Sequence, residues 1–438
     1  MNKMKTVYKL VLVSLLVMTA CENDLDQAPP NIASADSLED FEGVLNAAYY
    51  YQLGAVTPMA VMGDFRADNA VMDEEPYPEF DRFGPDLTVM EDQFFRPFYA
   101  ALYKSILSAN NVIENSSNET HVGEAKFLRA LSYFKLVQVF GDVTVNLAAT
   151  PDVTDPSILA RQPAAEVYNN VIIPDLQDAI ASLDNSKISS GRASRIASQA
   201  LLGRVYVYRN NFSSAEPLLA TVVNGAASAG LGLQANYADI FSVDNELNSE
   251  IIFAEPRSVS ISDEYGFTEF WSWYGGLDTK SLMPLDPDLI TAYDNSPGDL
   301  RRSVNIDEAL MASPKYPQSG GDDHDWIEIR LADVILLYAE SLNENGNTPA
   351  AIVELNKIRN RAGLANTTAT TQAEVRQAIA DERRLELAFE GHRWFDLVRT
   401  GTAEAEMGVT INSNYFLFPI PISEILATDG VITQNPGY

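Results

Sequence analysis

Helical periodicity dominates this chain, and the alternation typical of strands is scarce. Apolar side chains recur every three or four residues at Leu331, Ile335, Tyr338 and Leu342, and the same spacing occurs in several other segments. Such spacing places the apolar side chains on one face of an α-helix, which becomes stable when it packs against another helix. The sequence therefore predicts a mostly α-helical fold.

The predicted helices come in pairs. Leu202-Gly203-x-x-Tyr206, followed by Phe212 and Ala215, matches the tetratricopeptide pattern, in which glycine lets two antiparallel helices approach closely. Residues 333–361 form a second pair that turns at Asn345-Gly346-Asn347, and residues 124–139 with 162–183 form a third. Several such pairs in one chain predict an α-solenoid scaffold.

Residues 225–325 lack a regular helical pattern, because prolines, glycines and polar residues interrupt it there. Long loops of this kind are usually functional or disordered, and the density of aromatic residues favours function. We expect an irregular, loop-rich lobe between two helical regions, residues 36–224 and 326–438.

The N-terminus has the pattern of an export signal. Three lysines precede an apolar stretch at residues 10–18, which is too short to span a bilayer.

Cys21, the single cysteine, comes shortly after this apolar stretch. A lone cysteine is usually a buried core residue, but this position resembles a bacterial lipobox. We expect cleavage after residue 20 and a lipid anchor on Cys21, with a linker at residues 21–35. The acidic run at residues 22–26 is either a solvated linker or a signal for transfer to the cell surface.

Composition narrows the range of ligands. The chain has 61 acidic and 30 basic residues, a net charge of −31, so it should repel nucleic acids and anionic lipid head groups. Neutral ligands fit an acidic surface better.

The sequence shows no metal-binding pattern. The three histidines are scattered, and the acidic loop at residues 322–325 lacks EF-hand spacing. We therefore predict no metal and no cofactor.

A stripe of carboxylates is the feature that most suggests an enzyme. Glu382, Glu386 and Glu390 recur every fourth residue, in register with Val375 and Ile379. They could act as general acid and base. Alternatively, they form a buried ion network, and we favour this interpretation because buried charges normally have partners. The arginines near enough in sequence are Arg359, Arg361, Arg383, Arg384 and Arg393.

Two segments are candidates for ligand binding. Trp271, Trp273 and Tyr274 lie in a loop bounded by glycines, and sugars present flat C–H faces that stack on aromatic rings. Alternatively, these rings fill the interface between two lobes. The second candidate contains directional hydrogen-bonding groups, with one aromatic ring nearby; its residues are Asp64, Arg66, Asp68, Asn69 and Tyr77. The alternative there is a turn whose side chains satisfy the local backbone.

Four segments together resemble the SusD/RagB family of outer-membrane nutrient-binding lipoproteins. They are EAKFLRALSYFKLVQVFGD at residues 124–142, the helix pair at 329–363, DERRLELAFEGHRWFDLVR at 381–399, and FPIPISE at 418–424 with QNPGY at the end. They occur in the family's order and cover most of the chain outside the irregular lobe.

This resemblance implies a non-enzymatic lipoprotein, anchored and exposed at the outer-membrane surface, that captures glycans for a SusC-like TonB-dependent transporter. It places residues 381–399 in the scaffold and residues 64–69 near the ligand face. Three alternatives remain: a peptide ligand in place of a glycan, a surface glycoside hydrolase using Glu382 and Glu386, and a repeat scaffold that binds proteins alone.

Overall fold

The computed structural model describes residues 41–152, 155–256, 282–283, 285–316 and 324–438. Residues 42–438 form one compact unit, and the helices and strands below all belong to it. This part of the chain is mostly helical, which confirms the predicted fold class.

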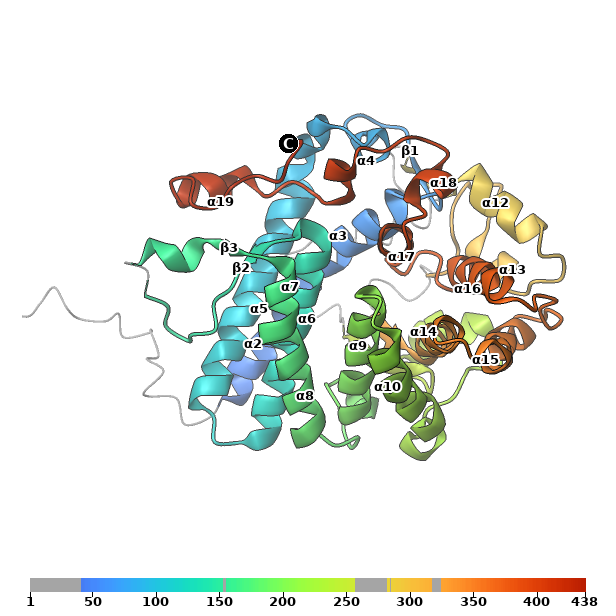
Figure 1. Ribbon diagram of the computed structural model, residues 1–438, viewed down its shortest axis with the longest axis horizontal. Helices are drawn as coiled ribbons and strands as arrows, with labels where there is room; N and C mark the ends of the chain where they lie inside the picture. Colours follow the sequence, from blue (N-terminus) through green and yellow to red (C-terminus); the bar gives the residue numbers. More distant parts are fainter. Residues whose placement is uncertain (1–40, 153–154, 257–281, 284, 317–323) are drawn as a thin grey trace, which may run out of the picture. The chain divides into compact units, whose positions relative to one another are not determined.

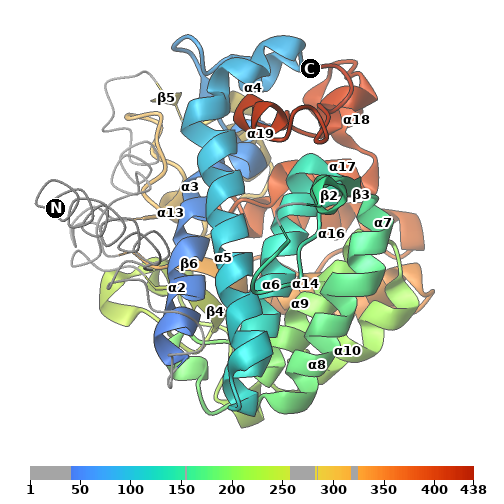
Figure 2. The ribbon, with the colours of Figure 1, turned by 90° about the vertical axis from the view of Figure 1, so that its left-hand side faces the viewer.

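A row of packed helices forms the scaffold (Figure 1). Successive members contact one another, and the row runs through α5 (Arg96–Asn115), α6 (Glu119–Phe140), α8 (Ile173–Ser182), α9 (Arg195–Tyr208), α10 (Phe212–Gly225), α14 (Leu331–Glu344) and α15 (Thr348–Arg361). The helix α2 (Glu42–Gln52) covers α5, and α16 (Gln372–Glu386) packs on α14. Seen from the side, α5 lies next to α6, and α8 lies on the other side of α6 (Figure 2). The three predicted helix pairs are thus present, as the solenoid prediction requires.

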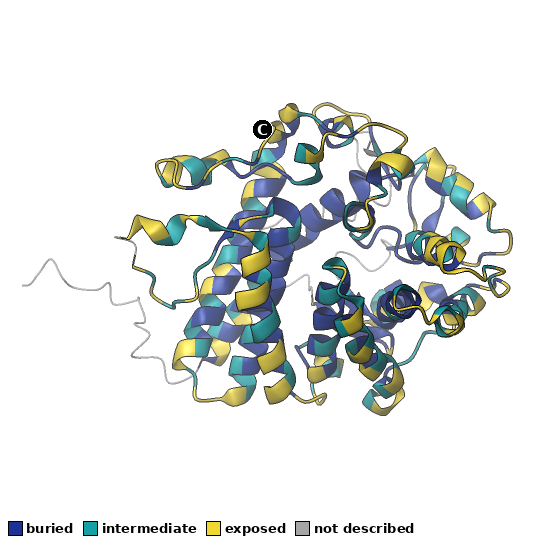
Figure 3. Cartoon of the chain, viewed as in Figure 1, coloured by how far each residue is buried: buried dark blue, intermediate teal, exposed yellow. Residues whose placement is uncertain are grey.

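Burial differs along this row. The helix α6 is buried over most of its length, because α5, α2 and α8 surround it. In contrast, α8 and α10 have exposed outer faces (Figure 3). A helix that is apolar on nearly every side belongs in the interior, whereas a one-sided apolar stripe belongs at the edge.

Glycine sets the close approach within the pair α9–α10. A Cβ atom on Gly203 would lie 2.4 Å from a methyl carbon of Leu219. The missing side chain therefore makes room for a leucine of the opposite helix, as the tetratricopeptide pattern predicts. The pair α14–α15 turns at Gly346, whose φ is +86°, and ends before Gly363, whose φ is +81°. Only glycine adopts such angles at little cost.

Among the described residues, the strands form three two-stranded antiparallel sheets. The longest pairs β4 (Ile251–Glu255) with β6 (Trp326–Arg330), and both strands are almost wholly buried. β1 (Val71–Met72) pairs with β5 (Leu282–Met283), and β2 (Val143–Thr144) pairs with β3 (Arg161–Gln162).

Shorter helices complete the described chain: α3 (Val56–Ala60), α4 (Glu79–Arg82), α7 (Ala164–Val167), α12 (Pro287–Asp294), α13 (Arg302–Asn305), α17 (Arg393–Thr400), α18 (Ala403–Met407) and α19 (Ile422–Ala427). The predicted irregular region contains few regular elements where it is described. Its standing as a separate lobe, and the other segment boundaries expected from the sequence, stay predictions. None of the helices in the described ranges is long and apolar enough to cross a bilayer.

Candidate functional site

The segment from Asp64 to Asn69 is buried and fastens the N-terminal part of the described chain to its C-terminal region. The Asp64 carboxylate accepts hydrogen bonds from the Asn69 side chain at 2.9 Å and from the backbone N–H groups of Phe389 and Gly391. Burial raises the pKa of Asp64 to about 6, although these hydrogen bonds oppose the rise. Asp64 thereby holds the turn that follows α16, where Phe389 and Gly391 both have positive φ.

Arg66 is fully buried in a cage of aromatic rings. Its guanidinium carbon lies 4.8–4.9 Å from the ring centres of Phe83, Trp394 and Phe418, a distance at which cation–π attraction is effective. It donates hydrogen bonds to the carbonyls of Phe80 and Tyr415 at 3.0 and 2.6 Å. Burial lowers the pKa of Arg66 to about 10. Arg66 therefore ties the C-terminal segment to the rest of the unit.

Asp68, Asn69 and Tyr77 are buried as well. Asp68 accepts two hydrogen bonds of 2.7 Å from Arg393 and lies 3.1 Å from Arg384. The Tyr77 hydroxyl accepts a hydrogen bond of 3.0 Å from Gln93. The five side chains predicted around this segment thus bind other parts of the protein, and their role in ligand binding stays a prediction.

Glu382, Glu386 and Glu390 lie in a buried ion network, which confirms the interpretation favoured from the sequence. We call it the inner ion cluster; its acids are Glu250, Asp299, Glu382, Glu386 and Glu390, and its cations are Arg301, Lys315, Arg330, Arg359 and Arg361. Formal charges within it balance. A buried network of this kind is stable only when each charge has close partners.

Glu386 is at the centre of the inner ion cluster. It pairs with Arg330 at 2.6 Å, Arg301 at 2.9 Å and Arg361. Burial alone would raise the pKa of Glu386, but these three guanidinium groups outweigh it and hold the pKa below its ordinary value. A carboxylate that stays ionised and has no open face is poorly suited to general acid catalysis.

The partners in this cluster were only partly predictable. Arg359 and Arg361 pair with Glu382 and Glu386, as their sequence proximity suggested. Arg301, Lys315 and Arg330 were not foreseen, because they come from the residue before α13, a loop and β6, more than 50 residues away. The local sequence carries no signal that these cations face α16.

Arg383 and Arg399 belong to a second group, the α14–α17 ion cluster, whereas Arg384 and Arg393 pair with Asp68. Among the described residues, none of the expected partners Arg383, Arg384 and Arg393 pairs with the glutamate stripe, so that part of the prediction is wrong. Arg383 bridges Asp333 at 2.7 Å and Asp396 at 2.9 Å, and Arg204 reaches Asp333 at 2.8 Å. Arg399 links Asp396 at 2.7 Å to Glu340 on α14 at 2.6 Å. Burial alone would raise the pKa of Asp396, but the two arginines lower it to about 2. This cluster joins α9, α14, α16 and α17.

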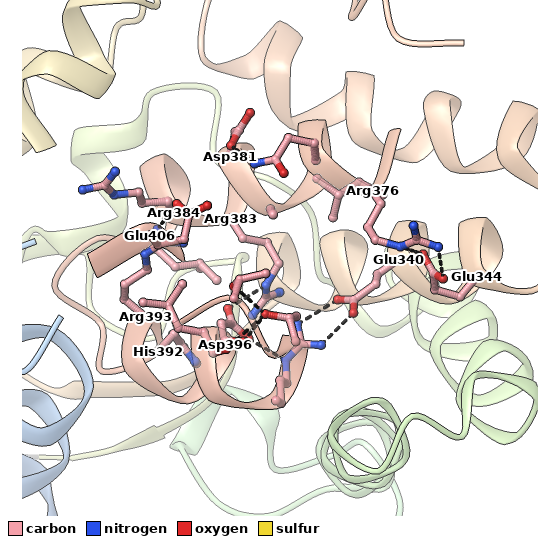
Figure 4. Close-up of a pocket in the computed structure, with 18 of the residues that line it drawn as sticks. Glu340, Glu344, Arg376, Asp381, Arg383, Arg384, His392, Arg393, Asp396 and Glu406 are labelled. Atoms are coloured by element: carbon pink, nitrogen blue, oxygen red, sulfur yellow. Dashed lines mark hydrogen bonds and ion pairs between the residues drawn. The ribbon is translucent and has the colours of Figure 1, made fainter. Parts of the chain in front are cut away.

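A pocket of about 290 Å³ opens beside the α14–α17 ion cluster, and we call it the scaffold pocket (Figure 4). Asn69 is one of its lining residues, and Asp68 binds two of its arginines. Arg383 and Asp396 lie at the centre of the view, with Arg384 and Arg393 to one side and Glu340, Glu344 and Arg376 to the other. Its charged lining residues are Arg376, Arg383, Arg384, Arg393, Arg399, Glu340, Glu344, Asp381, Asp396 and Glu406.

The aromatic candidates Trp271, Trp273 and Tyr274 lie outside the described residues, as do Cys21 and residues 322 and 323 of the acidic loop. Within the described ranges, histidine, cysteine and acidic side chains form no group of three or more that could hold a metal ion.

The paired helices and the ion clusters between them define a helical-repeat protein. Two family models match the chain: the SusD family over residues 291–438, and a family described as starch-binding and associating with the outer membrane over residues 22–207. The chain belongs to the SusD/RagB family.

Known proteins agree with this assignment along nearly the whole chain. SusD-like protein P38 of Formosa agariphila is 28% identical, covering 91% of this chain and 92% of the relative. A solved structure of a laminarin-binding SusD-like protein is 26% identical with a TM-score of 0.73, covering 91% and 99% of the two chains. Surface glycan-binding protein A from Bacteroides fluxus shares the fold, with a TM-score of 0.75 at 22% identity over 91% of this chain and 99% of that one.

Proposed function

We propose that this protein is a surface-exposed outer-membrane lipoprotein that binds oligosaccharides and delivers them to a SusC-like TonB-dependent transporter. The observation that carries the proposal is the end-to-end similarity, at 26% identity, to a protein named for binding laminarin, a glycan. The acidic composition agrees, because neutral sugars meet no electrostatic barrier at an acidic surface.

Recognition is assigned to Trp271, Trp273 and Tyr274. The stretch that contains them lies in the sequence between β4 and β5, and both strands are paired with strands elsewhere in the chain. Loops carried by a rigid scaffold are common binding elements. The chain just after β5 lies beside the second candidate segment, since the Asp286 N–H donates a 3.0 Å hydrogen bond to the Asn69 carbonyl. This proximity supports a ligand face that includes both segments.

A non-enzymatic role is part of the proposal. A glycosidase needs two carboxyl groups that face each other across an open cleft. Glu382 and Glu386 are instead buried on one helix and occupied by arginines. The described part of the chain therefore favours binding over hydrolysis.

Titration of the parent protein against a panel of neutral oligosaccharides, with peptides as the competing ligand class, tests the function. Alanine at Trp271, Trp273 or Tyr274 should abolish most of the affinity with little change in Tm, because few contacts dominate such binding. Tyr338→Ala, at a partly exposed position on α14, is the matched control. Tm and affinity that fall together would favour the interface-filling alternative. Unchanged affinity in all three variants would overturn this assignment.

The transporter partnership is tested separately. Extraction in mild detergent should co-purify the protein with a SusC-like barrel, whereas purification without any such barrel would contradict delivery. This experiment does not depend on which glycan is bound.

A further inference from the structure

The scaffold pocket is lined mainly by α16 and α17, with a few residues of α14 and of the start of α10, and is separate in sequence from the aromatic stretch at residues 270–276. Its volume, about 290 Å³, is at the lower end of the roughly 300–1,000 Å³ typical of small-molecule sites. A ligand of about one sugar ring in size fits a space of this volume.

The lining of the scaffold pocket has an apolar part. Ile379, Leu387 and Leu397 are buried beneath it, while Ala380 and Phe212 are partly exposed at its surface. A ligand that enters can therefore place one nonpolar face against Phe212 and Ala380 and remove that surface from water.

The polar part of the lining does not favour a charged ligand. Five arginines and five acidic residues line the pocket, so their formal charges cancel. Two of these arginines are already paired with acidic residues of the protein. Arg383 and Arg399 each bind two carboxylates at 2.6–2.9 Å. An ionic ligand would have to break such pairs, at considerable cost. Hydroxyl groups both donate and accept hydrogen bonds, so they can bind between paired charges without separating them.

Asp381 gives the pocket a group that is available for recognition. Among the described residues it forms no ion pair, and its one side-chain partner is Gln377, whose amide donates a 2.8 Å hydrogen bond. Burial raises the pKa of Asp381, and Glu406, which also lines the pocket, adds to the rise. A ligand hydroxyl can donate to the remaining carboxylate oxygen.

We propose that the scaffold pocket is a second carbohydrate site, one sugar unit in size, at which a neutral hexose lies against Phe212 and Ala380 and donates a hydroxyl hydrogen bond to Asp381. The proposal goes beyond the proposed function, because it concerns a different part of the chain and does not require the aromatic stretch to bind sugar.

Ligand-detected NMR on the full mature chain tests it. The protein used in this experiment carries alanine in place of Trp271, Trp273 and Tyr274, so that the signal does not report sugar bound at the aromatic stretch. The probes are glucose, galactose and mannose, with anionic glucuronate and cationic glucosamine as ligands of similar ring size and different charge. We expect saturation transfer to at least one neutral hexose and at least tenfold weaker binding of both charged sugars.

Two substitutions locate the bound sugar. Ala380→Phe fills the pocket without removing an ion pair and should abolish the transfer. Ala373→Phe makes the same change at an exposed position on α16 outside the lining and should leave the transfer intact. Asp381→Ala should weaken binding severalfold at unchanged Tm, and it serves as the decisive variant if Ala380→Phe folds poorly. The proposal is overturned if no neutral hexose binds, if Ala380→Phe folds and still binds normally, or if a charged sugar binds more tightly.

Discussion

Gly63 and Gly391 lie backbone against backbone, 328 residues apart in sequence: a Cβ atom on Gly63 would lie 2.2 Å from the Gly391 carbonyl oxygen. Asp64 accepts the Gly391 N–H beside this contact. The turn after α16 is therefore pressed onto the segment that precedes Arg66.

Gly63→Ala should destabilise the protein by about 3 kcal/mol, since backbone atoms would have to move to admit one methyl group. Gly43→Ala is the matched control, because a Cβ atom on that exposed α2 residue meets nothing within 4 Å. We expect the control to be neutral or stabilising by up to about 1 kcal/mol. Chemical denaturation measures both free energies of unfolding, and equal values for the two variants would contradict the close contact.

Glu386→Gln should destabilise the protein by roughly 3–5 kcal/mol, because it leaves buried arginines without their shared carboxylate. Glycan affinity of the folded fraction should barely change. Glu354→Gln breaks a pair with the more exposed Lys357 and should cost about 1 kcal/mol or less. A Glu386 variant that melts normally but has lost ligand binding would instead place this helix in the functional site.

Asp81 should make stability depend on pH. Burial raises the pKa of Asp81 to about 7; Arg66 opposes the rise, and Asp286 and Asp73 add to it. Between the unfolded pKa near 4 and the folded value near 7, the native state binds more protons than the unfolded state, so stability falls as pH rises.

Asp81→Asn removes the titrating carboxyl group and, with it, this loss of stability at higher pH. The free energy of unfolding of the parent, relative to the variant, should fall from pH 5 to pH 7 by at most about 1.4 kcal/mol per pH unit. Asp86→Asn makes the same substitution at an exposed aspartate of the neighbouring 3-10 helix (Pro85–Met90) and is the control for the loss of one carboxylate. A parallel pH profile for the parent and Asp81→Asn would refute the raised pKa.

Cys21→Ala should release the protein from the membrane fraction into the soluble fraction, because each buried methylene of a lipid anchor contributes roughly 0.8 kcal/mol of membrane affinity. Fractionation followed by mass spectrometry of the N-terminal peptide measures both location and lipid. Membrane association that survives detergent-free washing of the variant would show that Cys21 is not the anchor.

The helical scaffold was predictable because its signals are local. The stripe at Leu331 and Ile335 and the glycine of Leu202-Gly203 each describe a contact within one helix pair, and the structure contains both pairs. Patterns of three or four residues report which face of a helix is buried. They do not report what lies against that face.

Contacts between distant segments could not be predicted for that reason. Asp64 and Asp68 have the composition of a ligand loop, but their partners are Gly391 and Arg393, more than 320 residues later. Glu390 continues the four-residue spacing of the carboxylates, yet α16 ends at Glu386 and the chain turns through Phe389 with positive φ. Asp64 holds that turn, and nothing near Phe389 in the sequence indicates it.

The paired strands on either side of the aromatic stretch have an evolutionary consequence. The chain departs at Glu255, held opposite Trp326, and returns at Leu282, held opposite Met72. An insertion, deletion or replacement between these two points keeps every residue of both ladders and of the inner ion cluster in the sequence. If the proposed function holds, natural selection can therefore change this stretch, and with it the ligand, while the residues of the scaffold stay the same.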